Sequence, residues 1–368
     1  MYFPRRPSGS TLLKILFVGA CLFGGAGTRF SARAVQETQA AAAGDSDELK
    51  RGIELYRRGE AKAALPVLRA VIKKRPAEAR AWHFLGLALS RERDFKEAAE
   101  AFARAVKLEP NYAHAQAALA YTQLVLYKYD DAERAASRAL ALDTRNVEAH
   151  YVFGAVRLRK LGAAQALESA EAALKINPNF APAWLLKAQA LVGLNGEVYA
   201  SAFNLLTNRR PKSEPSSPED RARLARQLTE AAGALEQYIK LNRNPALASE
   251  LREQLETLRA HAGGLVPGGG GEQHIYTAED VTTKAVITTR PMPVFPRRTA
   301  RGWRIGSVVL RLVLAADGQV RHIFIISGLP DGLTEDVIKA AREIKFTPAT
   351  KDGRPVSQFI TLEYAFNL

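Results

Sequence analysis

The sequence predicts a multidomain protein in which an all-α helical solenoid is followed by a small α+β domain. Three observations support this prediction. The chain matches itself at a spacing of 34 residues, glycine dominates residues 263–271, and the hydrophobic period changes from helical to alternating after Lys284. At 368 residues, the chain is long enough for two ordinary domains with an appendage.

The 34-residue matches include small residues that would let paired helices approach closely. They are Gly52, Gly86, Ala120 and Gly154, and then Ala64, Ala98, Ala132 and Ala166. Successive units close at Pro76, Pro110, Thr144 and Pro178, and proline cannot continue a helix without losing a hydrogen bond. This pattern resembles the tetratricopeptide repeat, and residues 82–110 are its best match. We expect four units over about residues 45–180, a fifth beginning at Trp184, and closing helices at residues 219–241 and 246–261.

Such a solenoid predicts a concave groove that binds a peptide. Its expected lining residues are His83, Leu87, Arg91, Tyr121, Tyr151 and Arg159. The alternative is a scaffold whose inner face is only solvated.

The first 34 residues are typical of a targeting segment. Arg5 and Arg6 precede an apolar run over residues 15–27, and Ala32-Arg33-Ala34 is a small-x-small cleavage site. The run is shorter than the roughly 20 residues that span a bilayer. We therefore expect a cleaved export signal and a place in the periplasm or envelope of a Gram-negative-type bacterium. Residues 18–21 also resemble a lipobox, so a lipoprotein is one alternative, and an uncleaved inner-membrane anchor is another.

The remaining boundaries follow from composition. The predicted solenoid with its closing helices covers residues 45–261, a glycine-rich linker covers residues 262–283, and the C-terminal domain covers residues 284–368. A flexible linker of about 20 residues reaches only roughly 25 Å. It would tether the domain near the solenoid.

The C-terminal region predicts β-rich runs at residues 307–314 and 319–327, joined by a turn at residues 316–318. A helix is expected at residues 335–344, a basic helical turn at 296–303, and a final strand near the end. Alternation predicts two faces for that strand. Ile360, Leu362, Tyr364 and Phe366 would face the helices, while Ser357, Phe359, Thr361 and Glu363 would face the other way.

Five motifs in order resemble the C-terminal domain of the TonB energy-transducer family. They lie at residues 293–296, 306–309, 317–320, 344–349 and 352–356. The resemblance implies an antiparallel sheet of about three strands with two helices on one face. It also implies that the last strand pairs with an extended segment of an outer-membrane transporter, through Ser357, Phe359, Thr361 and Glu363. Phe359 would fill a pocket on a partner strand or take part in self-association through the terminal strand.

The leading functional hypothesis is an envelope protein-interaction protein, in which the repeats act as a scaffold and the terminal domain binds an extended peptide. The first alternative is a TonB-type energy transducer for outer-membrane transport. In this chain, however, the apolar N-terminal segment carries no histidine and a repeat array replaces the family's proline-rich spacer. The second alternative is a regulatory subunit of an envelope enzyme.

The net charge of +14 suits an acidic protein partner or an anionic wall or lipid surface. A basic cluster is formed by Arg297, Arg298, Arg301 and Arg304, although a solvated basic face is the alternative. No nucleic-acid-binding signature is present. The single cysteine, Cys21, excludes an intramolecular disulfide, and the six histidines form no zinc motif. We therefore expect no metal, no cofactor and no enzymatic activity.

Overall fold

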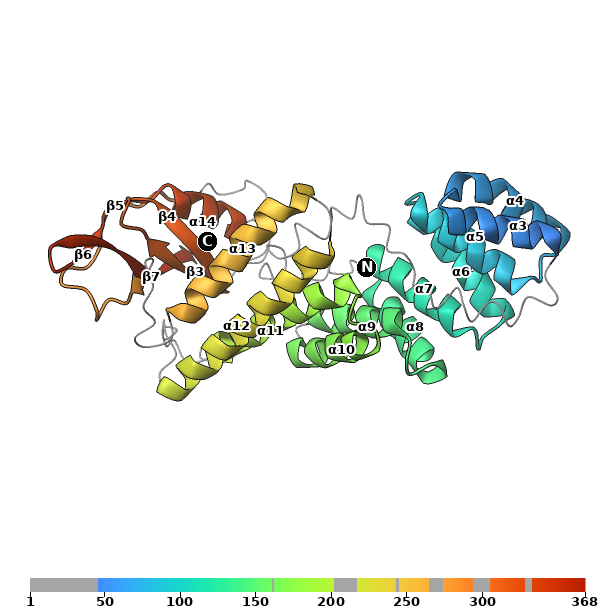
Figure 1. Ribbon diagram of the computed structural model, residues 1–368, viewed down its shortest axis with the longest axis horizontal. Helices are drawn as coiled ribbons and strands as arrows, with labels where there is room; N and C mark the ends of the chain where they lie inside the picture. The colour runs from blue at the N-terminus through green and yellow to red at the C-terminus, as the bar shows by residue number, and fades with distance from the viewer. Residues whose placement is uncertain are drawn as a thin grey trace. The chain divides into compact units, whose positions relative to one another are not determined.

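The computed structural model describes residues 46–160, 162–201, 217–242, 245–264, 274–293, 305–327 and 333–367. The chain divides into two compact units (Figure 1). The first contains almost all of the helices up to residue 176 and the beginning of the next one. The second contains the later helices and all of the described strands.

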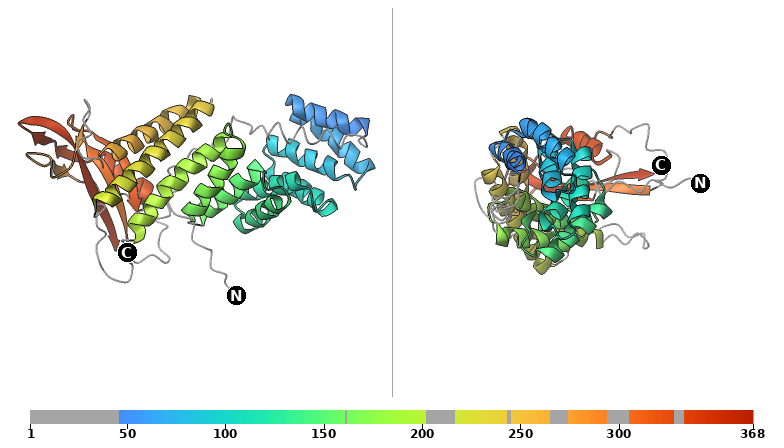
Figure 2. Two further views of the ribbon diagram at one scale, coloured as in Figure 1. Left: turned by 60° about the horizontal axis from the view of Figure 1, so that its bottom comes forward. Right: turned by 90° about the vertical axis from the view of Figure 1, so that its right-hand side faces the viewer.

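Paired helices build the first unit, and successive pairs follow one another along it (Figure 2). They are α3 (Asp47–Arg58), α4 (Ala61–Lys74), α5 (Ala79–Arg91), α6 (Phe95–Leu108), α7 (Ala113–Val125), α8 (Tyr129–Leu142), α9 (Val147–Arg159) and α10 (Ala163–Ile176). These pairs confirm the four predicted units, and α11 (Ala181–Ser201) begins the fifth.

Small residues allow the two helices of a unit to pack closely, as the repeat pattern predicts. A Cβ atom at Gly86 of α5 would lie 2.6 Å from the ring of Phe102, a fully buried residue of α6. In the preceding unit, a Cβ at Gly52 would lie 2.8 Å from the side chain of Leu68. Glycine at these positions is therefore required by the neighbouring helix.

One side-chain hydrogen bond recurs at the start of the first helix in successive units. Its donor changes in residue type, but its acceptor is always the carbonyl six residues earlier, in the turn that closes the preceding unit. The bonds are Trp82 Nε1 to Pro76 O (2.9 Å), Gln116 Nε2 to Pro110 O (3.3 Å), His150 Nε2 to Thr144 O (2.9 Å) and Trp184 Nε1 to Pro178 O (2.8 Å). The same hydrogen bond therefore recurs every 34 residues, and it joins each turn to the helix that follows it.

The second unit contains α12 (Pro218–Leu241) and α13 (Pro245–Gly263), which lie side by side (Figures 1 and 2). Both helices match the predicted closing helices. Ser217 caps α12, because its Oγ accepts a hydrogen bond of 3.0 Å from the Asp220 amide. Within the described residues, no helix is both long and apolar enough to cross a membrane.

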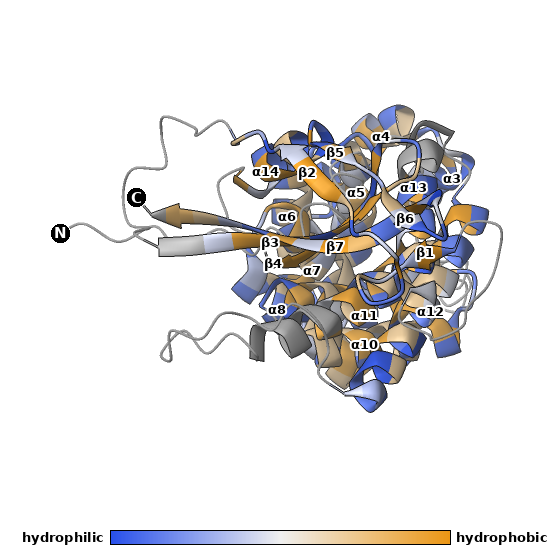
Figure 3. Ribbon diagram, turned by 90° about the vertical axis from the view of Figure 1, so that its left-hand side faces the viewer, coloured by the Kyte–Doolittle hydropathy of each residue, from blue (hydrophilic) through white to orange (hydrophobic). Residues whose placement is uncertain are grey.

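The strand-rich domain follows in the same unit. Its elements are β1 (Ile275–Tyr276), β2 (Val286–Thr289), β3 (Ile305–Leu314), β4 (Val320–Ser327), α14 (Leu333–Arg342), β5 (Lys345–Thr347), β6 (Ala349–Lys351) and β7 (Arg354–Asn367). The main sheet has the order β1-β7-β3-β4, and β6 pairs with the start of β7. A separate two-stranded sheet joins β2 to β5. The long antiparallel pair β3–β7 runs through the domain (Figure 3).

The main sheet buries side chains on both of its faces. On one face, Leu310 of β3 and Leu362 of β7 belong to a cluster with Val337 of α14. On the other face, Val313 and Phe359 are buried on the side that α13 covers. The predicted inward set of β7 is confirmed, since Ile360, Leu362, Tyr364 and Phe366 all belong to the α14 cluster.

The structure differs from the sequence expectations in two places. Residues 262–283, expected to form a linker, include the end of α13 and the strand β1, which pairs in parallel with β7 at Ser357 and Gln358. In addition, α13, expected only as a closing helix of the solenoid, covers the face of the sheet opposite to the one that α14 covers. Helices cover both faces because β3 carries buried apolar residues on each of them, and neither face is suited to contact with water. Residues 1–34 and the predicted helical turn at 296–303 lie outside the described residues.

We expect Gly86→Ala to destabilise the array. The added methyl group would overlap the buried Phe102 ring, and overpacking of this kind costs about 1–3 kcal/mol. Urea unfolding followed by circular dichroism would measure the change. Gly233→Ala in α12 is the matched control, because a Cβ there meets nothing within 4 Å. The control should gain about 0.5–1 kcal/mol from helix propensity. Equal stability of the two variants would contradict the close-packing account.

Candidate functional site

The sequence singles out two sets of residues within the described part of the chain. The terminal edge is the edge of β7 that faces away from β3, over residues 359–365. The residues expected from the sequence to line a repeat groove are His83, Leu87, Arg91, Tyr121, Tyr151 and Arg159.

The terminal edge begins where β1 stops. β3 occupies one edge of β7 from Gln358 to Asn367, and β1 occupies the opposite edge only at Ser357 and Gln358. Beyond Gln358, no further strand pairs with that opposite edge within the described part of the chain. A strand sends the backbone groups of alternate residues to opposite edges. The Glu363 carbonyl accepts a hydrogen bond from the side chain of Arg290, so the groups of Thr361, Glu363 and Ala365 point away from β3.

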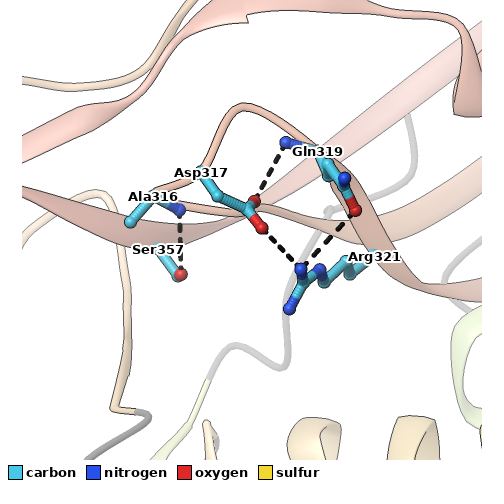
Figure 4. A network of polar contacts seen from close by, with 5 residues as sticks. All are labelled: Ala316, Asp317, Gln319, Arg321 and Ser357. Carbon is cyan, nitrogen blue, oxygen red and sulfur yellow. Dashed lines mark hydrogen bonds and ion pairs between the residues drawn. The ribbon is translucent and has the colours of Figure 1, made fainter.

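The four predicted strand-binding residues have different surroundings. Ser357 is engaged within the chain: its backbone pairs with β1, and its hydroxyl accepts a hydrogen bond of 3.1 Å from the Ala316 amide. Figure 4 shows this bond beside the β3–β4 turn, where Asp317 accepts hydrogen bonds from the Gln319 amide and from Arg321. Thr361 is half-buried and Glu363 is exposed. Of the four residues, these two lie on the open part of the edge.

Phe359, the fourth residue, is covered by α13. Its side chain is only 4% exposed, and a Cβ atom at Gly264 would lie 2.0 Å from its ring. The centroid of the His261 ring lies 5.1 Å from that of Phe359, and the Arg311 guanidinium carbon lies 4.5 Å from the Phe359 centroid. With α13 in this position, the Phe359 side chain does not reach a partner, although its backbone lies on the edge.

A bulge in β4 anchors the same helix. Arg311 pairs with Phe324 and Val313 with Arg321, so β4 carries an extra residue at this point. The extra residue accounts for the left-handed conformation of His322, at φ 50°. Its carbonyl accepts a hydrogen bond of 2.8 Å from Nε2 of the buried His261. The bulge therefore supplies the polar partner that a buried imidazole needs.

Burial keeps the two histidines of this contact uncharged. Burial, together with the nearby Arg311 cation, lowers the pKa of His261 to about 3, and the hydrogen bond to the His322 carbonyl opposes the shift. Burial also lowers the pKa of His322, although Glu256 and Glu253 act in the opposite direction. Both histidines are therefore neutral at pH 7, and the α13 contact excludes an imidazolium.

The predicted groove residues differ in exposure, and one of them belongs to a buried polar pair. His83 is 5% exposed, and its Nδ1 lies 2.9 Å from the Tyr112 hydroxyl. Burial lowers the pKa of His83 to about 3, with smaller effects from His114 and Arg80. This histidine is thus a neutral packing residue. Leu87 is also buried.

The other groove residues lie nearer the surface. Arg91 is exposed, its Nη1 donates a hydrogen bond of 3.4 Å to the Tyr56 carbonyl, and its guanidinium lies over the Tyr56 ring. Tyr121, Tyr151 and Arg159 are half-buried. Tyr151 makes an edge-to-face contact with Phe180, at 5.8 Å between centroids. The arrangement offers aromatic and cationic side chains, and the groove ligand stays a prediction.

Two further predictions concern charges and metals. The basic cluster at Arg297, Arg298, Arg301 and Arg304 lies outside the described residues. Among the residues that the structure describes, no group of three or more histidine, cysteine, aspartate or glutamate side chains could hold a metal ion.

Sequence reasoning missed the role of α13. Its end was expected to start a linker, because Gly263 and Gly264 precede a glycine run. The available signal was His261, an imidazole between small residues at the end of an amphipathic helix. That pattern could have indicated a second packing surface.

We expect Gly264→Ala to loosen α13 from the sheet, because its Cβ would overlap the Phe359 ring. Gly263→Ala is the matched control, since a Cβ at Gly263 meets nothing within 4 Å. Hydrogen exchange in β4 and β7 should accelerate by about 10- to 100-fold in the Gly264 variant, equivalent to about 1–3 kcal/mol. The control should exchange like the wild type. Unchanged exchange in both variants would refute the contact.

The same contact should weaken in acid. Burial lowers the pKa of His261 from the ordinary histidine value of 6.5, which applies in an unfolded chain, to about 3 in the folded protein. Between these values the unfolded state binds more protons, so stability falls as the pH decreases from about 6.5, by up to about 1.4 kcal/mol per pH unit. Exchange in β4, corrected for its intrinsic pH dependence, should therefore rise between pH 7 and pH 5.

His261→Leu should flatten that pH profile. His83 has the same sign of shift but lies in the other unit, so a local measurement in β4 separates the two histidines. An unchanged profile in the leucine variant would assign the effect to another group, such as His322.

The chain was compared with known proteins. Residues 291–368 match the family model "Gram-negative bacterial TonB protein C-terminal", and residues 49–113 match a tetratricopeptide repeat model. No match was found among curated protein sequences. Solved structures of helical repeat proteins are similar to about half of the chain. MamA is 20% identical, with 52% of this chain and 92% of MamA covered and a TM-score of 0.39. PilF of Pseudomonas aeruginosa is 21% identical, with 56% and 96% covered and a TM-score of 0.38.

The family matches confirm the two resemblances that the sequence predicted. Tetratricopeptide repeats are protein-interaction scaffolds, and the second match associates the C-terminal domain with the Gram-negative envelope. The chain therefore joins a tetratricopeptide-like solenoid to a strand-rich domain that matches the TonB C-terminal family.

Proposed function

We propose that this chain is an envelope interaction protein that binds an extended segment of another protein as an added strand along β7. The observation that supports this proposal is the terminal edge, where the backbone groups of Thr361, Glu363 and Ala365 point away from β3 and no described strand pairs with them. Exposed strand edges are templates for pairing, and proteins that do not use them usually cover them.

The terminal edge is long enough for a short added strand from a partner, called here the guest strand. Main-chain hydrogen bonds from three outward residues would contribute about 1 kcal/mol each, and ordering the guest opposes them. The interaction would be weak and reversible by itself. Since β1 already occupies the edge at Ser357, the guest would pair beyond Gln358. Specificity would come from side chains beside the edge.

The match to the TonB C-terminal family supports a periplasmic setting and an extended transporter segment as the guest. The helical array would then act as a scaffold that recruits a second protein. Exposed Arg91 and the half-buried aromatic residues Tyr121 and Tyr151 make an acidic or aromatic segment a suitable groove ligand. The net charge of +14 supports acidic partners in general.

We expect Thr361→Pro to abolish guest binding without unfolding the domain. Proline removes the outward amide of residue 361, and proline is tolerated at strand positions whose amide faces outward. Peptides of about ten residues, near the upper end of strand lengths, would be selected by phage display on the full wild-type chain. Their affinities for each variant would be measured by fluorescence anisotropy.

Thr361→Val is the matched control, because it keeps the amide and the branched shape. It should bind like the wild type, and circular dichroism should show both variants folded. Selected peptides that bind the proline variant as tightly as the wild type would refute strand addition. Binding that instead follows chain concentration, with dimers in solution, would assign the edge to self-association.

A further inference from the structure

In the middle of the terminal edge, the Glu363 carbonyl is already hydrogen-bonded to a side chain of the same chain. Nη2 of Arg290 donates a hydrogen bond to the Glu363 carbonyl, although the two residues are 73 positions apart in the chain. The guanidinium carbon of Arg290 also lies 4.0 Å from the centroid of the Tyr364 ring. Arg290 directly follows β2, whose pairing with β5 fixes the start of this segment.

This contact occupies an atom that a guest strand needs. A guest pairing with β7 would donate backbone hydrogen bonds to the outward carbonyls, and the Glu363 carbonyl lies between those of Thr361 and Ala365. The Arg290 guanidinium therefore donates the hydrogen bond that a backbone amide of the guest strand would otherwise donate to the Glu363 carbonyl. Strand addition therefore requires Arg290 to move away from the Glu363 carbonyl.

The displaced guanidinium would need a new acceptor. It would still lie close to Tyr364, which is 2% exposed and belongs to the α14 cluster. A guest residue that pairs with Tyr364 would place its side chain on that same face, with the two Cβ atoms about 5 Å apart. A carboxylate there could accept two parallel hydrogen bonds from the guanidinium.

We propose that Arg290 is a specificity-determining residue of the terminal edge. It caps the empty edge and selects extended peptides that carry an aspartate or glutamate opposite Tyr364. This inference rests on the proposed strand addition and names the chemistry of the guest.

The test uses a positional array of random peptides of about ten residues, in which one position at a time is fixed as Asp, Asn or Lys. The full wild-type chain should favour Asp over Asn at one position by about two- to fivefold, the range for exposed ion pairs. That preference should weaken at high salt. Arg290→Ala should lose the preference and bind the Asn peptides more tightly than the wild type does, because the Glu363 carbonyl is free.

Arg321→Ala is the matched control. Arg321 is an exposed arginine of the same domain, but it lies on β4, which is separated from β7 by β3, and it pairs with Asp317. Its variant should keep the wild-type preference. Arg290→Lys keeps the charge and loses the planar fork, so it should show a reduced preference. The lysine variant also provides the test if the alanine variant does not fold.

The outcomes separate the two proposals. If neither the wild type nor Arg290→Ala binds any peptide, strand addition itself fails. If peptides bind without an acidic preference, or if that preference persists in Arg290→Ala, the role of Arg290 fails and strand addition stands. In that case, Arg290 is only a structural contact between the segment after β2 and the last strand.

Discussion

The contact between the end of α13 and the sheet constrains the whole C-terminal unit. Gly264 approaches the Phe359 ring so closely that no side chain fits between them, and His261 fills the space beside them. This contact covers the sheet face that α14 leaves open. The domain is therefore sandwiched between helices from two parts of the chain, and the last helical hairpin and the sheet form one compact unit.

The side chains and the backbone of β7 make different kinds of contact. The side chains of this strand are used for packing on both faces, as Phe359 and Leu362 show. Within the described residues, β3 is the strand that pairs with the β7 backbone beyond Gln358, and on the opposite edge the Arg290 side chain binds the Glu363 carbonyl. A guest strand could thus pair with β7 without disturbing either core. The proposed strand addition would use the backbone of β7, while α13 and α14 pack on the side chains of its two faces.

The charges beside the edge follow a consistent pattern. Arg311 is buried against Phe359 on one face, and Arg290 lies over Tyr364 on the other. Each guanidinium stacks on an aromatic ring of β7, which is a favourable environment for a weakly hydrated cation. The buried arginine belongs to the packing of α13, whereas the exposed one reaches the open edge. The two stacking contacts are similar, but the Arg290 guanidinium also donates a hydrogen bond to the Glu363 carbonyl at the edge of β7.

The sequence by itself determined the helical pairs, the β3–β4 turn, and the inward face of β7. These depend on local periodicity, on Gly86, where the neighbouring helix leaves no room for a Cβ, and on Gly318, whose φ of 82° suits a tight turn. It also indicated that Thr361 and Glu363 belong to a strand near the end of the chain. Only the tertiary structure decided that α13 covers Phe359 and that Arg290 reaches Glu363. Those contacts join segments far apart in the chain, and no local pattern encodes which distant surface will meet a glycine or accept a guanidinium.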